Sequence, residues 1–187
     1  SLGEQREGAK RISSEALAKA IVDIKPERKQ KPKASVPLSL GDFYEACGYR
    51  SPSLMKQVRL LPGPTGETNR WSLHPRGLIL CLGPDAKSAY RQAALALSTG
   101  NSVLIVAPDA SSHPAYKLSE GLPLQVLDGW LEPDALKNMQ GVAAVSCNSS
   151  GDLQQAYRRA LGARDGAIIP LIHEVSQPDR YQVEKHL

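Results

Sequence analysis

The sequence contains little of what marks a specialised class of protein. Aromatic residues make up 5% of the 187 residues, and Phe43 is the single phenylalanine, so the core has to be built from Leu, Val, Ile and Ala. Hydrophobic residues reach 41% and charged residues 22%, which is typical of a globular chain. No apolar run approaches the roughly 20 residues that span a bilayer, and no signal peptide opens the chain. These absences argue against a disordered or a membrane-spanning protein.

Cysteine is also scarce. Cys47, Cys81 and Cys147 form neither an even set nor a C-x-x-C pair, which predicts free thiols in a reducing, intracellular setting. The four histidines are scattered, and no His or Cys pair has the spacing of zinc ligands. Cys147 lies in "SCNSSGD", where a strand is expected to give way to a helix that can lower a thiol pKa. No histidine is placed by spacing to act as its base, so we interpret Cys147 as buried and inert.

The net charge of +4 lies entirely in the first 35 residues, which hold nine Lys and Arg against five Asp and Glu. Such a basic N-terminal segment can contact phosphates or anionic lipid. No aromatic residue interleaves these charges, so the segment lacks a stacking platform for nucleic acid. We therefore interpret this segment as a solvated linker and expect no nucleic-acid partner.

The first 57 residues predict short helices over 13–24 and 39–49, joined by the charged, proline-broken stretch 25–37. The stretch "LLPGPTGETNRWSLHPRG", residues 60–77, follows. Proline removes a backbone donor and glycine adds chain entropy, so we expect neither a helix nor a central strand there.

From Gly77 onward strands alternate with helices. The fold class predicted is α/β, with a Rossmann-like, doubly wound, mostly parallel sheet preceded by an irregular, helical N-terminal segment. Pro170 places the last strand at an edge or a bulge. We expect two units, residues 1–57 as a helical linker segment and residues 58–187 as the Rossmann-like domain. The predicted strands are 77–83, 101–108, 122–129, 141–147 and 167–173, and the predicted helices are 84–100, 115–120, 132–139 and 150–166.

The sequence lacks the motifs of a nucleotide site. A dinucleotide fold needs G-x-G-x-x-G after its first strand, so that the backbone can approach a pyrophosphate at a helix N-terminus. This chain has Gly83, Pro84 and Asp85 instead, and a carboxylate at the helix start repels phosphate. No P-loop is present, and Asp128 and Asp165 stand beside glycines as turn residues. We therefore predict no catalytic residue, no bound cofactor and no metal in this segment.

The segment "LLPGPTGETNRWSLHPRGLILCLG", with "GNSVLIVAP" and "ARDGAIIPL", closely resembles the C-terminal region of long proline utilization A (PutA) proteins over residues 58–187. Those enzymes join an FAD-dependent proline dehydrogenase to an NAD-dependent glutamate-semialdehyde dehydrogenase. The resemblance implies a third, non-catalytic module with an aldehyde-dehydrogenase-superfamily Rossmann fold. It implies a lid that covers the dehydrogenase and helps to enclose the tunnel between the two sites.

The same resemblance implies that nucleotide binding is lost. Aldehyde dehydrogenases read approximately "PxGVxLxIxPWNxP", "ALAAGNTVVLKPSE" and "FTGS", and Gly100-Asn101 matches the second of these. Asp85-Ala86 replaces the Trp-Asn pair. Val106 and Ala110 stand where the family has the lysine and glutamate that hold the adenosine ribose. The catalytic half, with its nucleophilic cysteine, is missing.

The resemblance also carries expectations about the parent protein. Family members continue into a glycine-rich tail resembling "TAAAGGNAS", and this chain stops before it, so we expect a piece of a larger polypeptide. The expected partners are the neighbouring catalytic domains of the same polypeptide or oligomer, with FAD and NAD bound in the parent. The parent is expected to be a homo-oligomer in the cytoplasm, able to associate peripherally with the inner membrane.

The proline-rich segment 60–77 is the expected docking element. A rigid segment holds a module in a fixed position against its neighbour, whereas a flexible Gly/Ser linker does not. An autonomous small-molecule-binding or thiol-dependent α/β enzyme, using the strand ends near Gly83 and Cys147, stays open as the alternative. Trp71 is either such an anchor or ordinary core. The candidate interface residues are Pro62, Pro64, Thr65, Glu67, Arg70 and Trp71.

Overall fold

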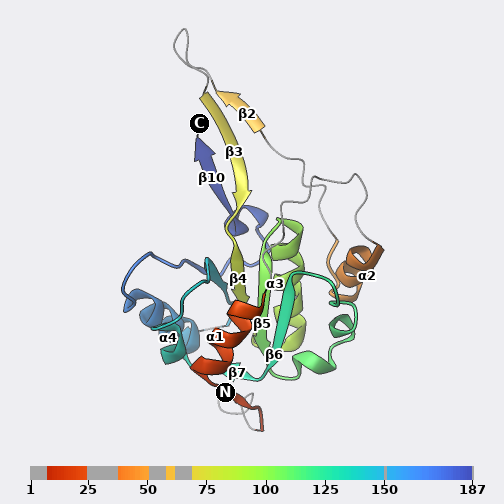
Figure 1. Ribbon diagram of the computed structural model, residues 1–187, viewed down its shortest axis with the longest axis vertical. Coiled ribbons are helices and arrows are strands. Elements are labelled where there is room, and N and C mark those ends of the chain that lie inside the picture. The colour runs from red at the N-terminus through yellow and green to blue at the C-terminus, as the bar shows by residue number, and fades with distance from the viewer. Residues whose placement is uncertain (1–7, 25–37, 51–57, 62–68, 150, 187) are drawn as a thin grey trace.

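The protein is built around a five-stranded parallel sheet (Figure 1). A computed structural model describes residues 8–24, 38–50, 58–61, 69–149 and 151–186. The apolar run of β4 is buried on both faces of the sheet, and Ile79, Leu80 and Cys81 have no exposed surface. The predicted Rossmann-like α/β class is confirmed. In spatial order the strands are β6 (Leu124–Asp128), β5 (Ser102–Ala107), β4 (Leu78–Cys81), β8 (Ala144–Ser146) and β9 (Leu171–Ile172), and every neighbouring pair is parallel.

Helices cover both faces of this sheet. On one face α3 (Ala86–Ser98) and α2 (Leu38–Ala46) pack over Ile79 and Cys81, with the rings of Phe43 and Tyr90 6.1 Å apart. On the other face α1 (Ser14–Asp23) and α4 (Gly151–Gly162) pack over Leu80. None of the described helices is long and apolar enough to cross a membrane.

Two of the crossover segments are shorter than the sequence suggests. The helices predicted over 115–120 and 132–139 are wrong, because the chain forms single 3₁₀ turns there. These turns are η2 (Ala110–Ser112) and η3 (Pro114–Tyr116) before β6, and η4 (Pro133–Leu136) before β8. Each turn buries one residue, Ala110, Ala115 or Leu136, and a single anchor does not supply the apolar face of an α-helix.

Elements from the N-terminal part of the chain cover the sheet beside these short crossovers. Helix α2 contacts η3, and α1 contacts β6. Helix α1 begins as predicted, with the hydroxyl of Ser13 accepting a hydrogen bond from the Ala16 N–H at 3.1 Å. The described parts of residues 1–57 therefore share the core of the sheet, while the division of the chain at residue 57 stays a prediction.

A two-residue parallel ladder fixes the approach of α1. Strand β1 (Arg11–Ile12) pairs with β7 (Trp130–Leu131), and the Trp130 N–H donates to the Lys10 carbonyl at 2.9 Å. Gly129 has φ 148°, and a Cβ there would lie 2.1 Å from the Lys10 oxygen. Only glycine lets the two segments approach so closely.

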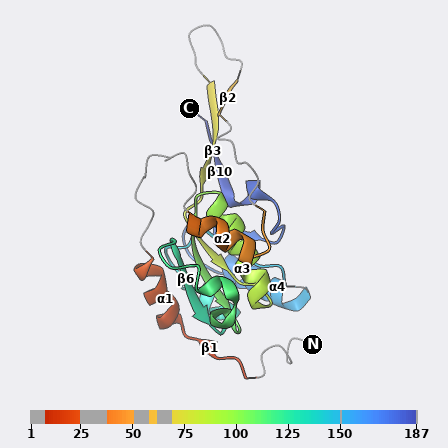
Figure 2. The ribbon, with the colours of Figure 1, turned by 90° about the vertical axis from the view of Figure 1, so that its right-hand side faces the viewer.

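A second sheet projects from the body as an arm (Figures 1 and 2). It consists of β2 (Val58–Leu61), β3 (Asn69–Pro75) and β10 (Gln182–His186), paired antiparallel in the order β10-β3-β2. The expectation that residues 60–77 hold no central strand is therefore wrong, because β3 is the middle strand. Proline is tolerated there because Pro75 is the last residue of β3, where a missing N–H costs least.

The side chain of Asn101 joins the base of this arm to the body. Its oxygen accepts from the Gly77 N–H at 3.0 Å, and its amide donates to the Tyr181 carbonyl at 2.9 Å. Gly77 links β3 to β4, and Tyr181 ends η5 (Pro178–Tyr181) just before β10. The amide also donates to the Ala96 carbonyl and the Thr99 hydroxyl, at the end of α3. Both strands at the root of the arm are thus fixed to one buried amide.

We expect Leu17→Ala to destabilise the chain strongly, because Leu17 of α1 is 2% exposed within the core of the sheet. Truncating a buried leucine typically costs about 2–5 kcal/mol of unfolding free energy. Urea unfolding of the whole chain followed by circular dichroism measures this. Val22→Ala on the same helix is the matched control, since Val22 is 81% exposed and should change little. Equal midpoints for the two variants would contradict the packing described for α1.

Candidate functional site

In an open α/β sheet, ligands bind beyond the carboxyl ends of the strands, where the strand order reverses. Here the order reverses between β4 and β8, so the crevice expected from topology lies between Leu82-Gly83 and Cys147-Asn148. The Leu82 N–H donates to the Ser146 carbonyl at 2.8 Å, which holds the two strand ends together. This edge of the sheet is where a cofactor would be sought first.

The helix N-terminus at this crevice is already occupied. Helix α3 starts at Ala86, two residues later than the start predicted from the sequence, and its N-cap is Asp85. The Asp85 carboxylate accepts from the Ser88 N–H at 2.7 Å, and its carbonyl accepts from the Ala89 N–H at 3.1 Å. The carboxylate therefore takes one of the first-turn N–H donors and places a negative charge at the positive end of the helix dipole, where a phosphate would bind.

Gly83 closes the same space from the other side. A Cβ on Gly83 would lie 2.3 Å from the Ala89 nitrogen and 2.7 Å from the Asp85 oxygen, so its backbone rests against the first turn of α3. The close approach of the chain to the helix requires a glycine here, as the tight turn of a dinucleotide fold also does. The Asp85 carboxylate is the group in this turn that disfavours a bound phosphate.

The two positions that the resemblance links to ribose binding are also closed. Val106 is 2% exposed within β5, and Ala110 is fully buried in η2. Neither side chain carries a hydrogen-bonding group, and both are covered by the core. They cannot hold a sugar hydroxyl.

Cys147 follows β8 as predicted and is fully buried. Its thiol donates to the Ser149 hydroxyl at 3.2 Å, and burial raises the pKa of the thiol above its ordinary value. A nucleophilic cysteine needs the opposite shift. Burial likewise raises the pKa of Cys47 to about 12. Within the described ranges no three His, Cys, Asp or Glu side chains gather as metal ligands.

His113, between η2 and η3, has a structural task. Its ring stacks on Tyr90 with centroids 4.3 Å apart, and its Nδ1 accepts from the Ala115 N–H at 3.2 Å. Burial lowers the pKa of His113, which keeps the ring neutral and Nδ1 free to accept. The sequence showed a lone histidine here and carried no signal of the stack.

A polar pair that sequence reasoning missed lies behind the crevice. Gln92 of α3 is 1% exposed, and its amide donates to Asn148 Oδ1 at 2.8 Å. The Gln92 Oε1 atom is buried without a hydrogen-bond partner. Such an orphaned acceptor is uncommon in a folded protein, because leaving it unpaired costs about 1–3 kcal/mol.

The sequence-predicted interface residues lie away from the crevice. Pro62, Pro64, Thr65 and Glu67 fall outside the described residues. Arg70 is exposed and Trp71 is half-buried, and both belong to β3 of the arm.

Successive strand residues point to opposite faces, so Arg70 and Trp71 project from the two sides of the arm. Because the arm enters β4 at its amino end, these residues are at the opposite end of the sheet from Gly83. The structure therefore separates the predicted docking element from the place where chemistry would be expected.

Known proteins resemble this chain over its greater part, although no family model matches it. The bifunctional protein PutA of Escherichia coli is 38% identical over 113 residues, which is 59% of this chain and 8% of the relative. The PutA of Rhizobium meliloti is 42% identical over 111 residues, 58% of this chain and 9% of the relative. This chain is related to the PutA proteins. It spans less than a tenth of their length.

Solved structures agree with this relationship. A variant of Bradyrhizobium japonicum PutA matches 71% of this chain with 26% identity and a TM-score of 0.54, over 15% of its own length. The 3,6-anhydro-L-galactose dehydrogenase matches 71% of this chain and 30% of its own with a TM-score of 0.53. At 18% identity that second likeness shows the fold alone. The predicted resemblance to PutA is confirmed, and the likeness to the aldehyde dehydrogenases is one of fold.

We expect Cys147 to react slowly with a thiol reagent at neutral pH, since it is buried and its thiol donates to Ser149. Labelling followed by mass spectrometry of the cysteine peptides measures the rate, with and without denaturant. Cys81, also fully buried, provides the internal reference. Labelling of Cys147 in the folded chain at the denatured rate would show an accessible thiolate and contradict the inert role.

Proposed function

We propose that this chain is a non-catalytic module of a PutA-type protein. In this proposal the parent joins an FAD-dependent proline dehydrogenase to an NAD-dependent L-glutamate γ-semialdehyde dehydrogenase, which together convert proline to glutamate. The module covers the second active site and helps to enclose the tunnel that passes the intermediate. The observation that supports the non-catalytic part is the N-terminus of α3, where the Asp85 carboxylate caps the helix and would repel a phosphate.

The arm supports the docking part of the proposal. A three-stranded sheet on its own buries little apolar surface, and this one stands clear of the helices that cover the main sheet (Figures 1 and 2). Trp71 and Leu73 alternate with Ser72 and His74 along β3, so apolar side chains project from the arm beside polar ones. A neighbouring domain laid on the arm would cover them.

The proposed partners are the catalytic domains of the same polypeptide or of a second subunit in a homo-oligomer. Pro62, Pro64, Thr65, Glu67, Arg70 and Trp71 are the proposed contact residues. The four hydrogen bonds of Asn101 favour this role, because an arm braced at its root loses little freedom on docking. We place the parent in the cytoplasm, with FAD and NAD bound in its catalytic domains.

A small-molecule site at the crevice is the second candidate function. The orphaned Oε1 of Gln92 favours it, because a ligand amide or hydroxyl could donate to that atom. A thiol-dependent reaction has less support, since Cys147 is buried and its pKa is raised.

We expect the chain not to bind NAD. The reason is that Asp85 caps α3 and that Val106 and Ala110 are buried apolar residues. Isothermal titration of the 187-residue chain with NAD measures this, with an active aldehyde dehydrogenase as the positive control. A dissociation constant in the micromolar range would overturn the non-catalytic module and favour the enzyme.

We expect Trp71→Ala to leave the melting temperature of this chain nearly unchanged, because Trp71 lies on the arm and is only half-buried. In the full-length parent the same change should slow the flux from proline to glutamate severalfold, while proline oxidation alone stays normal. Arg70→Ala, on the other face of the arm, tests which face docks.

Unfolding of this chain by Trp71→Ala, at the roughly 3–5 kcal/mol of a truncated core aromatic, would show that Trp71 is core. Unchanged flux with unchanged stability would show that the arm does not dock through Trp71.

A further inference from the structure

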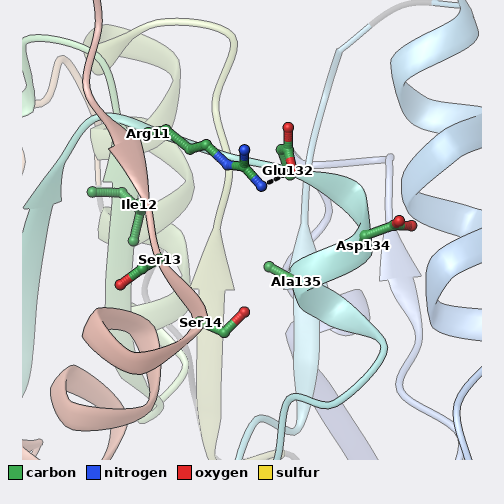
Figure 3. Close-up of a pocket in the computed structure, with 7 residues that line it drawn as sticks. All are labelled: Arg11, Ile12, Ser13, Ser14, Glu132, Asp134 and Ala135. Carbon is green, nitrogen blue, oxygen red and sulfur yellow. Dashed lines mark hydrogen bonds and ion pairs between the residues drawn. The ribbon is translucent and has the colours of Figure 1, made fainter.

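A cavity of about 380 Å³ shares no lining residue with the crevice or the arm. It opens between the N-terminal segment and the segment after β7 (Figure 3). The parallel strands β1 and β7 each run directly into a helical turn, β1 into α1 and β7 into η4. The carboxyl ends of two parallel strands therefore meet at this cavity, which is the arrangement in which α/β proteins place ligands.

The polar walls of the cavity carry one charge of each sign. The Arg11 guanidinium reaches from β1 across the gap to the Glu132 carboxylate, with which it forms an ion pair (Figure 3). The side chains are 65% and 35% exposed, so the pair stays open to solvent and to exchange. A solvent-exposed pair of this kind is worth about 0–1 kcal/mol, and a ligand can replace it at little cost.

The rest of the lining adds a hydroxyl and an apolar floor. The Ser14 hydroxyl faces Ala135 across the gap below the ion pair (Figure 3). Ile12 lines the cavity and is 6% exposed, so its position is fixed by the core. Asp134 points away from Arg11 in Figure 3 and pairs with Lys137 at 2.9 Å. Glu132 is therefore the carboxylate that serves this cavity.

We propose that this cavity binds a small zwitterion of the α-amino acid class. A guanidinium and a carboxylate held at one mouth favour a ligand that is neutral overall and carries both charges. The ligand carboxylate pairs with Arg11 and accepts from the Ser14 hydroxyl, and the ammonium group donates to Glu132. A ligand that carries only a negative charge would be repelled by Glu132, and a ligand that carries only a positive charge would be repelled by Arg11. The Ala135 methyl group, which faces the gap, contacts the aliphatic side chain of the ligand.

Binding would also tie α1 to the body. Arg11 and Ser14 belong to the N-terminal segment, whereas Glu132 belongs to the segment after β7. A ligand that contacts both sides binds the folded state and not the unfolded chain, so it raises the melting temperature as the logarithm of its concentration once that exceeds the dissociation constant. This proposal is independent of any role of the chain in a PutA-type protein.

The test is a titration of the isotope-labelled 187-residue chain with L-alanine, followed by amide NMR and by the melting temperature. We expect saturable shifts of the Ser14 and Ala135 amides, together with a rise in melting temperature. Acetate and methylammonium, each carrying one of the two charges, should bind at least about tenfold more weakly, as expected when a hydrogen bond to a charged group is lost.

Arg11→Gln and Glu132→Gln should each weaken L-alanine binding about tenfold or more. Lys137→Gln is the matched control, since it removes the ion pair with Asp134 and leaves Arg11, Ser14 and Glu132 unchanged, and it should bind as the unchanged chain does. If either charge variant fails to fold, Ser14→Ala tests the site instead, because it keeps both charges. It should weaken L-alanine binding if the Ser14 hydroxyl contacts the ligand. Absence of saturation, equal binding of acetate, or equal loss in Lys137→Gln would each overturn the proposal.

Discussion

The buried side-chain amide of Asn101 is the constraint on which the outer parts of this protein depend. It is 1% exposed and makes four hydrogen bonds, which satisfy its oxygen and both amide protons. The partners come from the end of α3, the start of β4 and the turn before β10, which are distant in sequence. Each of these hydrogen bonds contributes about 1 kcal/mol net to stability. Loss of the Asn101 amide would leave its buried partner groups without a hydrogen bond, at a cost of about 1–3 kcal/mol for each group. No other side-chain type has the same shape with one acceptor and two donors in reach, glutamine being longer.

The two ends of the sheet differ in character. At the carboxyl end, the Asp85 carboxylate caps α3, the backbone at Gly83 rests against the first turn of that helix, and Val106 is covered by the core. At the amino end, the chain leaves the sheet as an arm whose root is held by Asn101. The core that connects the two ends is built from β4 and β5.

Most of the fold could be predicted from the sequence, since buried strands such as "GLILCLG" and "NSVLIVAP" are largely apolar runs, Gly100 follows the end of α3, and α4 ends at Gly162. The crossovers could not, because "EPDALKNM" has a helix-like composition, although only Leu136 of η4 is buried. The arm was missed because β3 holds polar residues on an uncovered sheet, where the alternating pattern of a half-buried strand is weak.

The site was predicted less completely than the fold. The charge of Asp85 at a helix start indicated a group that repels phosphate. The absence of a base placed near Cys147 indicated an inert thiol. Asn101 was visible as a match to a family pattern, but the pattern does not show what an amide contacts 80 residues away. Gln92 and the cavity at Arg11 depend on contacts between distant segments, and the Arg11–Glu132 pair joins residues 121 positions apart. No local pattern carries that information.

The placement of α1 has a consequence for the order of folding. Residues 8–24 leave the ribosome before the partners of β1, which are synthesised more than a hundred residues later. Contacts of such large sequence separation close slowly, because the chain entropy of the intervening loop has to be spent before they form. The first helix of the sequence is therefore among the last to dock. Until it does, the apolar face around Leu80 and Leu104 remains uncovered, which makes the interval before docking the stage most exposed to aggregation.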